Sequence, residues 1–332
     1  MNEQPKTENK EQKSFLDHWL ETEFNEQYES QVKILQRLGL VNLLPDAEKM
    51  GIVGIDGKEY PVPSKEDIIR EIKSNPEKYE TKMRQGFTKI QLTPFAVPLE
   101  ELAMALERVL LDHYKRGKLL ATKEKPTDPD EPLELGPEGP LFKWNGWIEP
   151  NDTEGQRGAD VTGKCVYHVT NFDKGNHGGQ TKTEILKTQA GLPFAGWEVK
   201  LLGSSPNIPR EGKGKTVGGR KQLETNKTSE DYLKLLRTDP KYKHEQGLTN
   251  EDWLTQLIVH LEQTNQVIDD WQGNAKCLLV GSFTYDRSIL GKGYWSRLSH
   301  GACLNGETTG WRDYKDGLRT VVPVGQELKF EK

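Results

Sequence analysis

The chain has 332 residues, of which 33% are hydrophobic and 29% are charged, and its formal net charge is -5. Its mean hydropathy of -0.78 is low, which predicts small packed layers with long loops rather than one thick core. The negative charge gives no general attraction for phosphate backbones, so nucleic acid is not an expected partner, and no apolar stretch reaches the ~20 residues of a membrane span.

The N-terminal part of the chain predicts mainly helices. Residues 1–14 are almost wholly polar and contain no apolar signal segment, so we expect a disordered arm and a cytoplasmic or virion-associated protein. Apolar residues recur at three- and four-residue steps from Phe15, which predicts a helix that ends near Gly39. Ser64 is placed to cap a second helix, and residues 98–118 carry the stripe of a longer one.

Turn and proline signals divide the chain. An Asp-Gly turn within residues 51–62 predicts a β-hairpin inside a mainly helical domain, 15–122. Prolines alternate with acidic residues over 123–140, which excludes a helix and predicts a linker. We therefore expect a second domain over 141–325 and a short tail over 326–332.

The second domain is predicted to mix strands and helices. Residues 164–169 and 197–202 have the β-branched and aromatic content of strands, whereas 228–236 and 250–262 have helical periodicity. The β-branched run over 317–324 predicts a closing strand. Two helices beside short strands give an α+β class.

The segment Gly281–Val324 has the composition of a binding surface. Apolar anchors recur at short intervals, and the residues between them mix Tyr, Trp, Arg, Asp, Asn and Ser with glycine. Rigid aromatic side chains combined with adaptable polar ones are typical of paratopes. Within this segment we expect Trp295 to fill the core and Tyr314 to lie exposed on a loop.

The same segment resembles the variable proteins of diversity-generating retroelements. The matching residues are Tyr294-Trp295-x-Arg297, Ala302-x-Leu304, and Arg312 followed by Gly317-x-Arg319; upstream stretches 248–254 and 260–270 also match. The resemblance covers mainly residues 200–324. It implies a C-type lectin fold of the subgroup related to formylglycine-generating enzymes, placed at the C-terminus behind the helical region.

In that family a reverse transcriptase rewrites chosen codons by copying a template with errors at adenines, and the protein displays the rewritten residues to a ligand. The resemblance implies no catalysis and a protein or cell-surface ligand, and it allows a homo-oligomer. The positions that it assigns to the variable ligand-binding surface are Thr284, Tyr285, Arg287, Ser296, Leu298, Ser299, Cys303, Asn305, Glu307, Trp311, Asp313, Tyr314 and Lys315. The framework positions are Trp295, Arg297, Leu304, Gly317 and Arg319.

Other interpretations stay open beside this one. The three cysteines have no CxxC spacing, which argues against a disulfide framework or a zinc site, but Cys277 and Cys303 could serve a formylglycine-generating type of copper and thiol enzyme. A fixed structural component of a phage or cell surface is a third alternative. No cofactor is expected, although the carboxylates Glu262, Asp269 and Asp270 leave room for a structural divalent cation.

One short motif is similar to a nucleotide-binding loop but lacks two features that such a loop needs. Gly214-Lys215-Thr216 matches the end of a phosphate-binding loop, but the position of the first glycine is Pro209 and no apolar strand precedes it. We expect a solvated loop there. The histidines have no metal-ligand spacing, and His260 is expected to be a core imidazole on a helix.

Overall fold

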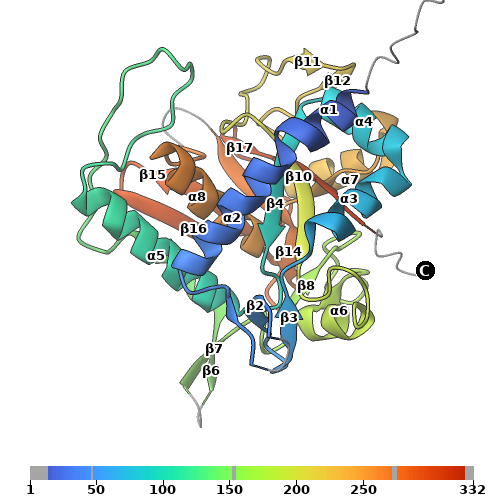
Figure 1. Ribbon diagram of the computed structural model, residues 1–332. Helices are drawn as coiled ribbons and strands as arrows, with labels where there is room; N and C mark the ends of the chain where they lie inside the picture. Colours follow the sequence, from blue (N-terminus) through green and yellow to red (C-terminus); the bar gives the residue numbers. More distant parts are fainter. Residues whose placement is uncertain (1–13, 46–47, 152–154, 271–274, 326–332) are drawn as a thin grey trace, which may run out of the picture.

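The computed structural model describes residues 14–45, 48–151, 155–270 and 275–325, which form a mixed α+β structure (Figure 1). The predicted α+β class is therefore confirmed. The predicted arm lies outside the described residues except for Ser14, whose hydroxyl caps the first helix. The predicted tail also lies outside them.

The N-terminal helices follow the predicted apolar stripe. Instead of one helix, the structure has α1 (Phe15–Thr22) and α2 (Phe24–Arg37), separated at Glu23, and the chain leaves α2 through Gly39 at φ +74°. The side chain of Ser64 accepts a hydrogen bond from the backbone of Asp67 and begins α3, as predicted. The helices that follow are α3 (Lys65–Ser74), α4 (Pro76–Arg84) and α5 (Leu99–Lys115).

The predicted hairpin is present. Its strands β2 (Met50–Val53) and β3 (Glu59–Pro61) are antiparallel, and Gly57 takes a φ of +73° in the turn between them. Strand β1 (Asn42–Leu43) adds to β2 and completes a three-stranded sheet.

Two larger sheets form the centre of the molecule. The four-stranded sheet is antiparallel in the order β13 (Gln246–Gly247), β18 (Thr320–Pro323), β10 (Glu198–Gly203) and β4 (Phe87–Thr93). The seven-stranded sheet has the order β5 (Leu141–Lys143), β16 (Gly301–Thr308), β15 (Ile289–Ser296), β14 (Lys276–Thr284), β8 (Cys165–Tyr167) and β9 (Gln180–Thr181), with β17 (Asp316–Gly317) beside β14. The remaining elements are β6 (Ile148–Asn151), β7 (Gly155–Gly158), β11 (Thr216–Val217), β12 (Arg220–Lys221), α6 (Lys182–Thr188), α7 (Ser229–Thr238), α8 (Asn250–Thr264) and the 3-10 turns η1 (Asn145–Trp147) and η2 (Pro240–Tyr242).

Helix α8 contacts both sheets, since it packs against β4 on one side and against β14 and β15 on the other. Two glycines of β15 make this approach close. A Cβ at Gly293 would lie 2.3 Å from the Trp253 ring, and one at Gly291 would lie 2.0 Å from Asn250 Oδ1. The second sheet therefore depends on glycine where it meets α8.

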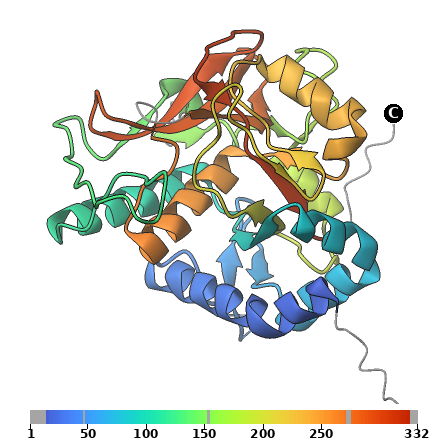
Figure 2. The same ribbon diagram turned by 90° about the horizontal axis from the view of Figure 1, so that it is seen from above.

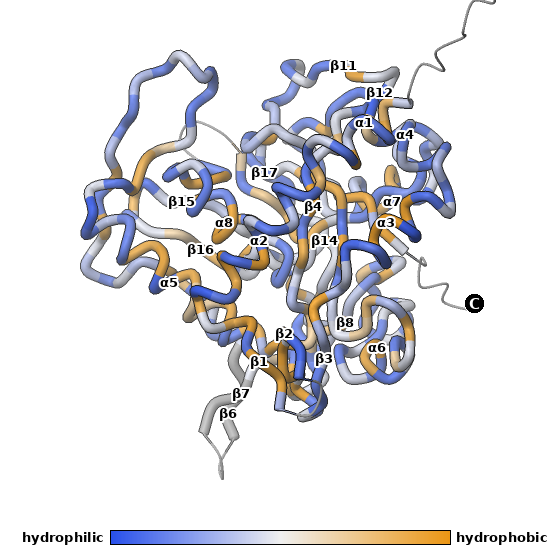
Figure 3. Tube along the Cα trace, in the orientation of Figure 1, coloured by the Kyte–Doolittle hydropathy of each residue, from blue (hydrophilic) through white to orange (hydrophobic). Residues whose placement is uncertain are grey.

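The predicted domains share a sheet and a core. Strand β4, from the N-terminal range, pairs with β10 from the C-terminal range, and one cluster of buried apolar residues extends through both. Residues 123–140 form a mostly exposed loop without a helix or a named strand. Figure 2 shows α1 and α2 on one side of the molecule and the C-terminal strands on the other. Figure 3 shows hydrophilic residues both in the outer loops and along the helices, where they alternate with hydrophobic ones.

Candidate functional site

The β15–β16 hairpin brings several predicted ligand-binding residues onto one face. Cys303, Asn305 and Glu307 lie opposite Tyr294, Lys292 and Leu290 in the antiparallel register. Directly opposite residues point to the same side of a sheet, whereas neighbours along a strand alternate. These side chains therefore share the face turned away from α8.

Ion pairs connect this face to the loop between β16 and β17. Lys276 Nζ, from β14, lies 3.3 Å from Asp313 Oδ2 and 5.5 Å from the centroid of the Tyr294 ring. Lys292 pairs with Glu307. Leu290 on this side of the sheet is buried in a second apolar cluster, and Lys292 and Cys303 are also buried. We call the part around Tyr294, Asn305 and Glu307, together with residues 309–315, the polar face.

Two large aromatic side chains stand at the edge of the polar face. Trp311 is 59% exposed and Tyr314 is 70% exposed, as predicted for Tyr314. Backbone contacts hold the base of their loop, because Lys276 N–H donates to the Lys315 carbonyl and Arg312 Nε donates to the carbonyl of Asn226, both within 3.0 Å. The exposed rings are thus carried by an anchored loop, and exposed aromatics are frequent anchors of binding surfaces.

Asp316 lies buried at the base of this loop. Its side chain is fully buried, and neither carboxylate oxygen accepts a hydrogen bond from the described residues. Lys292 Nζ lies 3.7 Å from Asp316 Oδ2. Burial raises the pKa of Asp316 to about 6, and the lysines reduce that rise.

Some predicted ligand-binding residues lie elsewhere or are covered. Thr284, Ser296 and Cys303 are buried. Tyr285 and Arg287 are in the turn between β14 and β15, where Tyr285 stacks on the His177 ring and Arg287 lies over Trp144. Leu298 and Ser299 are in the β15–β16 turn, and Leu298 is 79% exposed.

The predicted framework residues are mostly interior. Trp295 and Leu304 are each 1% exposed on the α8 side of the sheet, as predicted for Trp295, and Gly317 is buried in β17. Arg319 is also buried and donates to Asp269 Oδ1 at 2.7 Å. Half-buried Arg297 pairs with Asp270 and with Glu131 of the predicted linker.

Cys277 and Cys303, the two thiols considered for a copper enzyme, lie on opposite faces of the sheet. Cys277 is opposite Gly293 in β15, and Cys303 is opposite Tyr294, the next residue. Because adjacent residues alternate in direction, Cys277 points to α8 and Cys303 to the polar face. Burial raises the pKa of both thiols. This geometry does not allow both sulfurs to bind one copper ion.

The carboxylates considered for a divalent cation each have an arginine partner. Asp269 pairs with Arg319, Asp270 with Arg297, and Glu262 with Arg37. In the described part of the chain, no three metal-binding side chains form a group. The acidic residues therefore connect distant segments by ion pairs.

Gly214 and Lys215 of the phosphate-loop motif lie in the loop before β11, as expected, and exposed Thr216 begins that strand. The N–H of Gly214 donates to Glu224 Oε1 at 2.8 Å, and the N–H of Lys215 donates to Gln222 Oε1 at 3.1 Å. The two backbone N–H groups that a phosphate would need are therefore already hydrogen-bonded to side chains of the protein. His260 is on α8, where burial, followed by the charge of Arg319, lowers its pKa to about 4.

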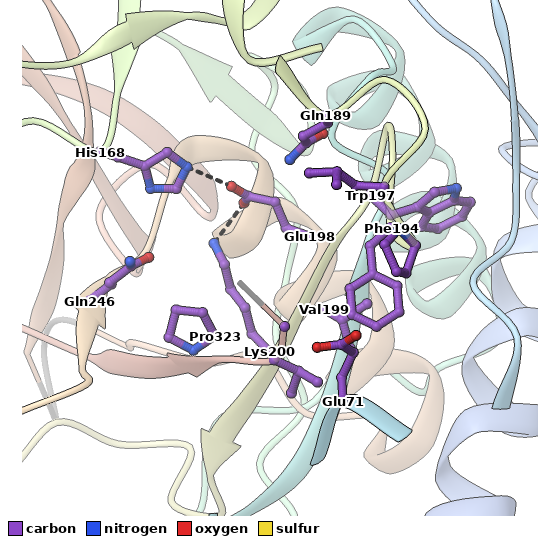
Figure 4. Close-up of a pocket in the computed structure, with 14 residues that line it drawn as sticks. Glu71, His168, Gln189, Phe194, Trp197, Glu198, Val199, Lys200, Gln246 and Pro323 are labelled. Atoms are coloured by element: carbon purple, nitrogen blue, oxygen red, sulfur yellow. Dashed lines mark hydrogen bonds and ion pairs between the residues drawn. The ribbon is translucent and has the colours of Figure 1, made fainter. Parts of the chain in front are cut away.

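A pocket of about 210 Å³ lies on the four-stranded sheet, away from the predicted residues (Figure 4). His168, Glu198 and Lys200 supply its polar side, and Phe194 and Trp197 belong to its apolar side. Sequence reasoning missed it because its residues come from separate segments. The one available signal was the pair Glu198 and Lys200, which alternate within the otherwise apolar strand WEVKLL and so share a face.

Comparison with family models, curated proteins and solved structures finds no match to this chain. Among the helices of the described residues, none combines the length and apolar character needed to cross a bilayer.

Proposed function

We propose that this chain is a ligand-binding display protein, with a C-type lectin-like framework that carries residues diversified by a retroelement. The observation that supports it most is the arrangement around the β15–β16 hairpin. Predicted variable positions Asn305, Glu307 and Asp313 gather on the polar face, while predicted framework residues Trp295 and Leu304 pack on the opposite side. In this proposal, strand alternation places the variable positions Asn305 and Glu307 and the framework positions Trp295 and Leu304 on opposite faces of the sheet.

The chemistry of the polar face suits capture of a protein surface. Trp311 and Tyr314 offer large rigid rings, which cost little conformational entropy on binding. Lys276, Asp313 and Lys315 offer charges of both signs, which can pair with polar groups of a partner. The partner class that we propose is therefore a protein or cell-surface ligand.

Sequencing the DNA that flanks the gene tests the diversification. We expect a near-copy of the segment that encodes Ser282–Val324 beside a reverse-transcriptase gene, with the differences confined to adenines of the template copy. Differences at all four bases, or no copy at all, would contradict diversification and leave a fixed binding protein.

A displayed library tests the surface itself. We expect that variants randomised at exposed or half-buried positions remain folded, because surface substitutions usually change stability by only about 0.5 kcal/mol. Panning on biotinylated lysozyme should then yield binders. The randomised positions are Ser299, Asn305, Trp311, Asp313, Tyr314 and Lys315.

A second library, randomised at buried positions, is the control for this test. Randomising the buried positions Leu279, Leu290, Trp295 and Leu304 should abolish folding in most clones. In a lysozyme-binding clone, alanine at positions 313 and 314 together should weaken capture by at least about tenfold without shifting the thermal midpoint. Equal loss of folded protein in the two libraries, or selected clones that ignore positions 313 and 314, would place the surface elsewhere.

A further inference from the structure

The pocket of Figure 4 is built on the four-stranded sheet, whereas the polar face belongs to the seven-stranded sheet. Glu198 and Lys200 enter it from β10, and His168 enters from the residue after β8. Phe194 lies across from His168. The cavity of about 210 Å³ is smaller than the roughly 300–1,000 Å³ of drug-sized sites, so its ligand must be small.

Buried charges form the polar side of this pocket. Glu198 Oε1 lies 2.9 Å from His168 Nε2, and Glu198 Oε2 lies 2.6 Å from Lys200 Nζ. Lys200 also forms an ion pair with Asp252, and Asp252 accepts a hydrogen bond from the Thr93 hydroxyl. The side chains of Glu198 and Lys200 are only 7% and 3% exposed, so both are held rigidly.

The ammonium of Lys200 is already balanced by the carboxylates of Glu198 and Asp252. Burial alone would raise the pKa of Glu198, but Lys200 and His168 outweigh burial and lower it to about 2. Burial would lower the pKa of Lys200, but Asp252 and Glu198 hold it above its usual value. Both groups therefore stay ionised at physiological pH.

An incoming anion would meet Glu198 and, at the rim, Glu71. Lys78 contacts the Pro323 carbonyl oxygen at 3.2 Å and is not among the lining residues. Asp252 pairs with Lys200 from outside the lining, and the three carboxylates of Glu71, Glu198 and Asp252 outnumber the two basic groups, Lys200 and His168, so a positive ligand is favoured. The Phe194 ring adds a surface on which a cation is stabilised by cation–π attraction.

The apolar side of the pocket fits the body of such a ligand. It includes Leu192, Pro193, Phe194 and Val324. Gln189 accepts a hydrogen bond from the N–H of Gly196 at 3.2 Å, which fixes its side chain beside the opening. A site with apolar walls and a few fixed polar groups is the usual form of a small-molecule site.

We infer that this pocket binds a small organic cation, in which an ammonium group faces Glu198 and a compact apolar body packs against Phe194. The full chain can be titrated by calorimetry with three probes of one shape: phenethylamine, phenethyl alcohol and phenylacetate. We expect phenethylamine to bind at least about tenfold tighter than the alcohol, and phenylacetate to bind weakest. Equal or tighter binding of phenylacetate, or no binding of phenethylamine at millimolar concentration, would overturn the assignment.

Variants locate the binding site. Leu192 is 38% exposed at the opening, so Leu192→Trp should block phenethylamine while leaving the buried ion pairs intact. Glu198→Gln should weaken phenethylamine binding by about tenfold, so that the difference in affinity between phenethylamine and phenethyl alcohol becomes smaller. Glu100→Gln, which alters a carboxylate paired with Lys143 elsewhere, is the control and should bind normally. Unchanged binding by Leu192→Trp would refute the site even if Glu198→Gln failed to fold.

Discussion

Replacing Lys182 with methionine is expected to lower the free energy of unfolding by about 3–5 kcal/mol. The Lys182 side chain is fully buried, and its Nζ lies 2.7 Å from Asp160 and 2.9 Å from Glu251. Methionine fills a similar volume but leaves two buried carboxylates without their cation. Removing one partner of a buried ion pair costs more than the pair contributes, because the remaining charge stays desolvated.

The effect should be large because this cluster joins several elements. Asp160 Oδ2 accepts from the N–H of Leu99 at the start of α5, and Glu251 is in the first turn of α8. Tyr167 from β8 donates to Glu251 at 2.6 Å. Burial raises the pKa of Glu251, and the charge of Lys182 opposes that rise. Loss of Lys182 therefore loosens contacts between both halves of the chain.

Urea unfolding at pH 7, followed by circular dichroism, measures this loss. Lys187→Met is the matched control, because Lys187 is an exposed lysine of the same helix and should change stability by only about 0.5 kcal/mol. Neutralising both carboxylates as well, with Asp160→Asn and Glu251→Gln, should recover part of the loss. A Lys182→Met variant within about 1 kcal/mol of the parent would contradict the buried-charge argument.

Local signals predicted the local structure well. Ser64 caps α3, the Asp56-Gly57 turn closes the β2–β3 hairpin, and α8 begins within its predicted range because Thr249 and Asp252 form a capping box. Each of these features depends on residues only a few positions apart. Sequence periodicity and capping chemistry are sufficient for such features.

Long-range pairing explains what was missed. Strand β4 alternates polar and apolar residues only over the five residues from Lys89 to Thr93, and its partner β10 lies far along the chain, where no local signal identifies it. Lys182 follows a polar stretch, and lysine is rarely buried, so the sequence predicts an exposed side chain. Its burial depends on the ion pair with Asp160, which is more than twenty residues away in the chain and is visible only in the structure. The local pattern predicted that Tyr314 is exposed, but the burial of Cys303, which the resemblance assigns to the variable surface, depends on segments that pack over the sheet and could not be predicted from its neighbours in sequence.

Replacing Asp316 with asparagine is expected to stabilise the folded protein by about 2 kcal/mol at pH 7. Burial raises the pKa of Asp316 from 3.8 to about 6, so its ionised form is disfavoured in the folded state. Two pKa units correspond to about 3 kcal/mol. Asparagine removes this penalty but keeps an amide without hydrogen-bond partners, which costs about 1 kcal/mol.

The sign of this effect sets its pH dependence. A folded-state pKa above the unfolded value means that the folded protein binds the proton more tightly, so this residue's contribution to stability falls as pH rises from about 4 to about 6. The advantage of Asp316→Asn should therefore be full at pH 7 and vanish near pH 4, and unfolding of both proteins at each pH measures it. An equal advantage at both pH values would mean that the buried charge is not its source. Because Asp316 lies beneath the loop of Trp311 and Tyr314, a confirmed penalty would mean that the ionised carboxylate destabilises the base of the polar face.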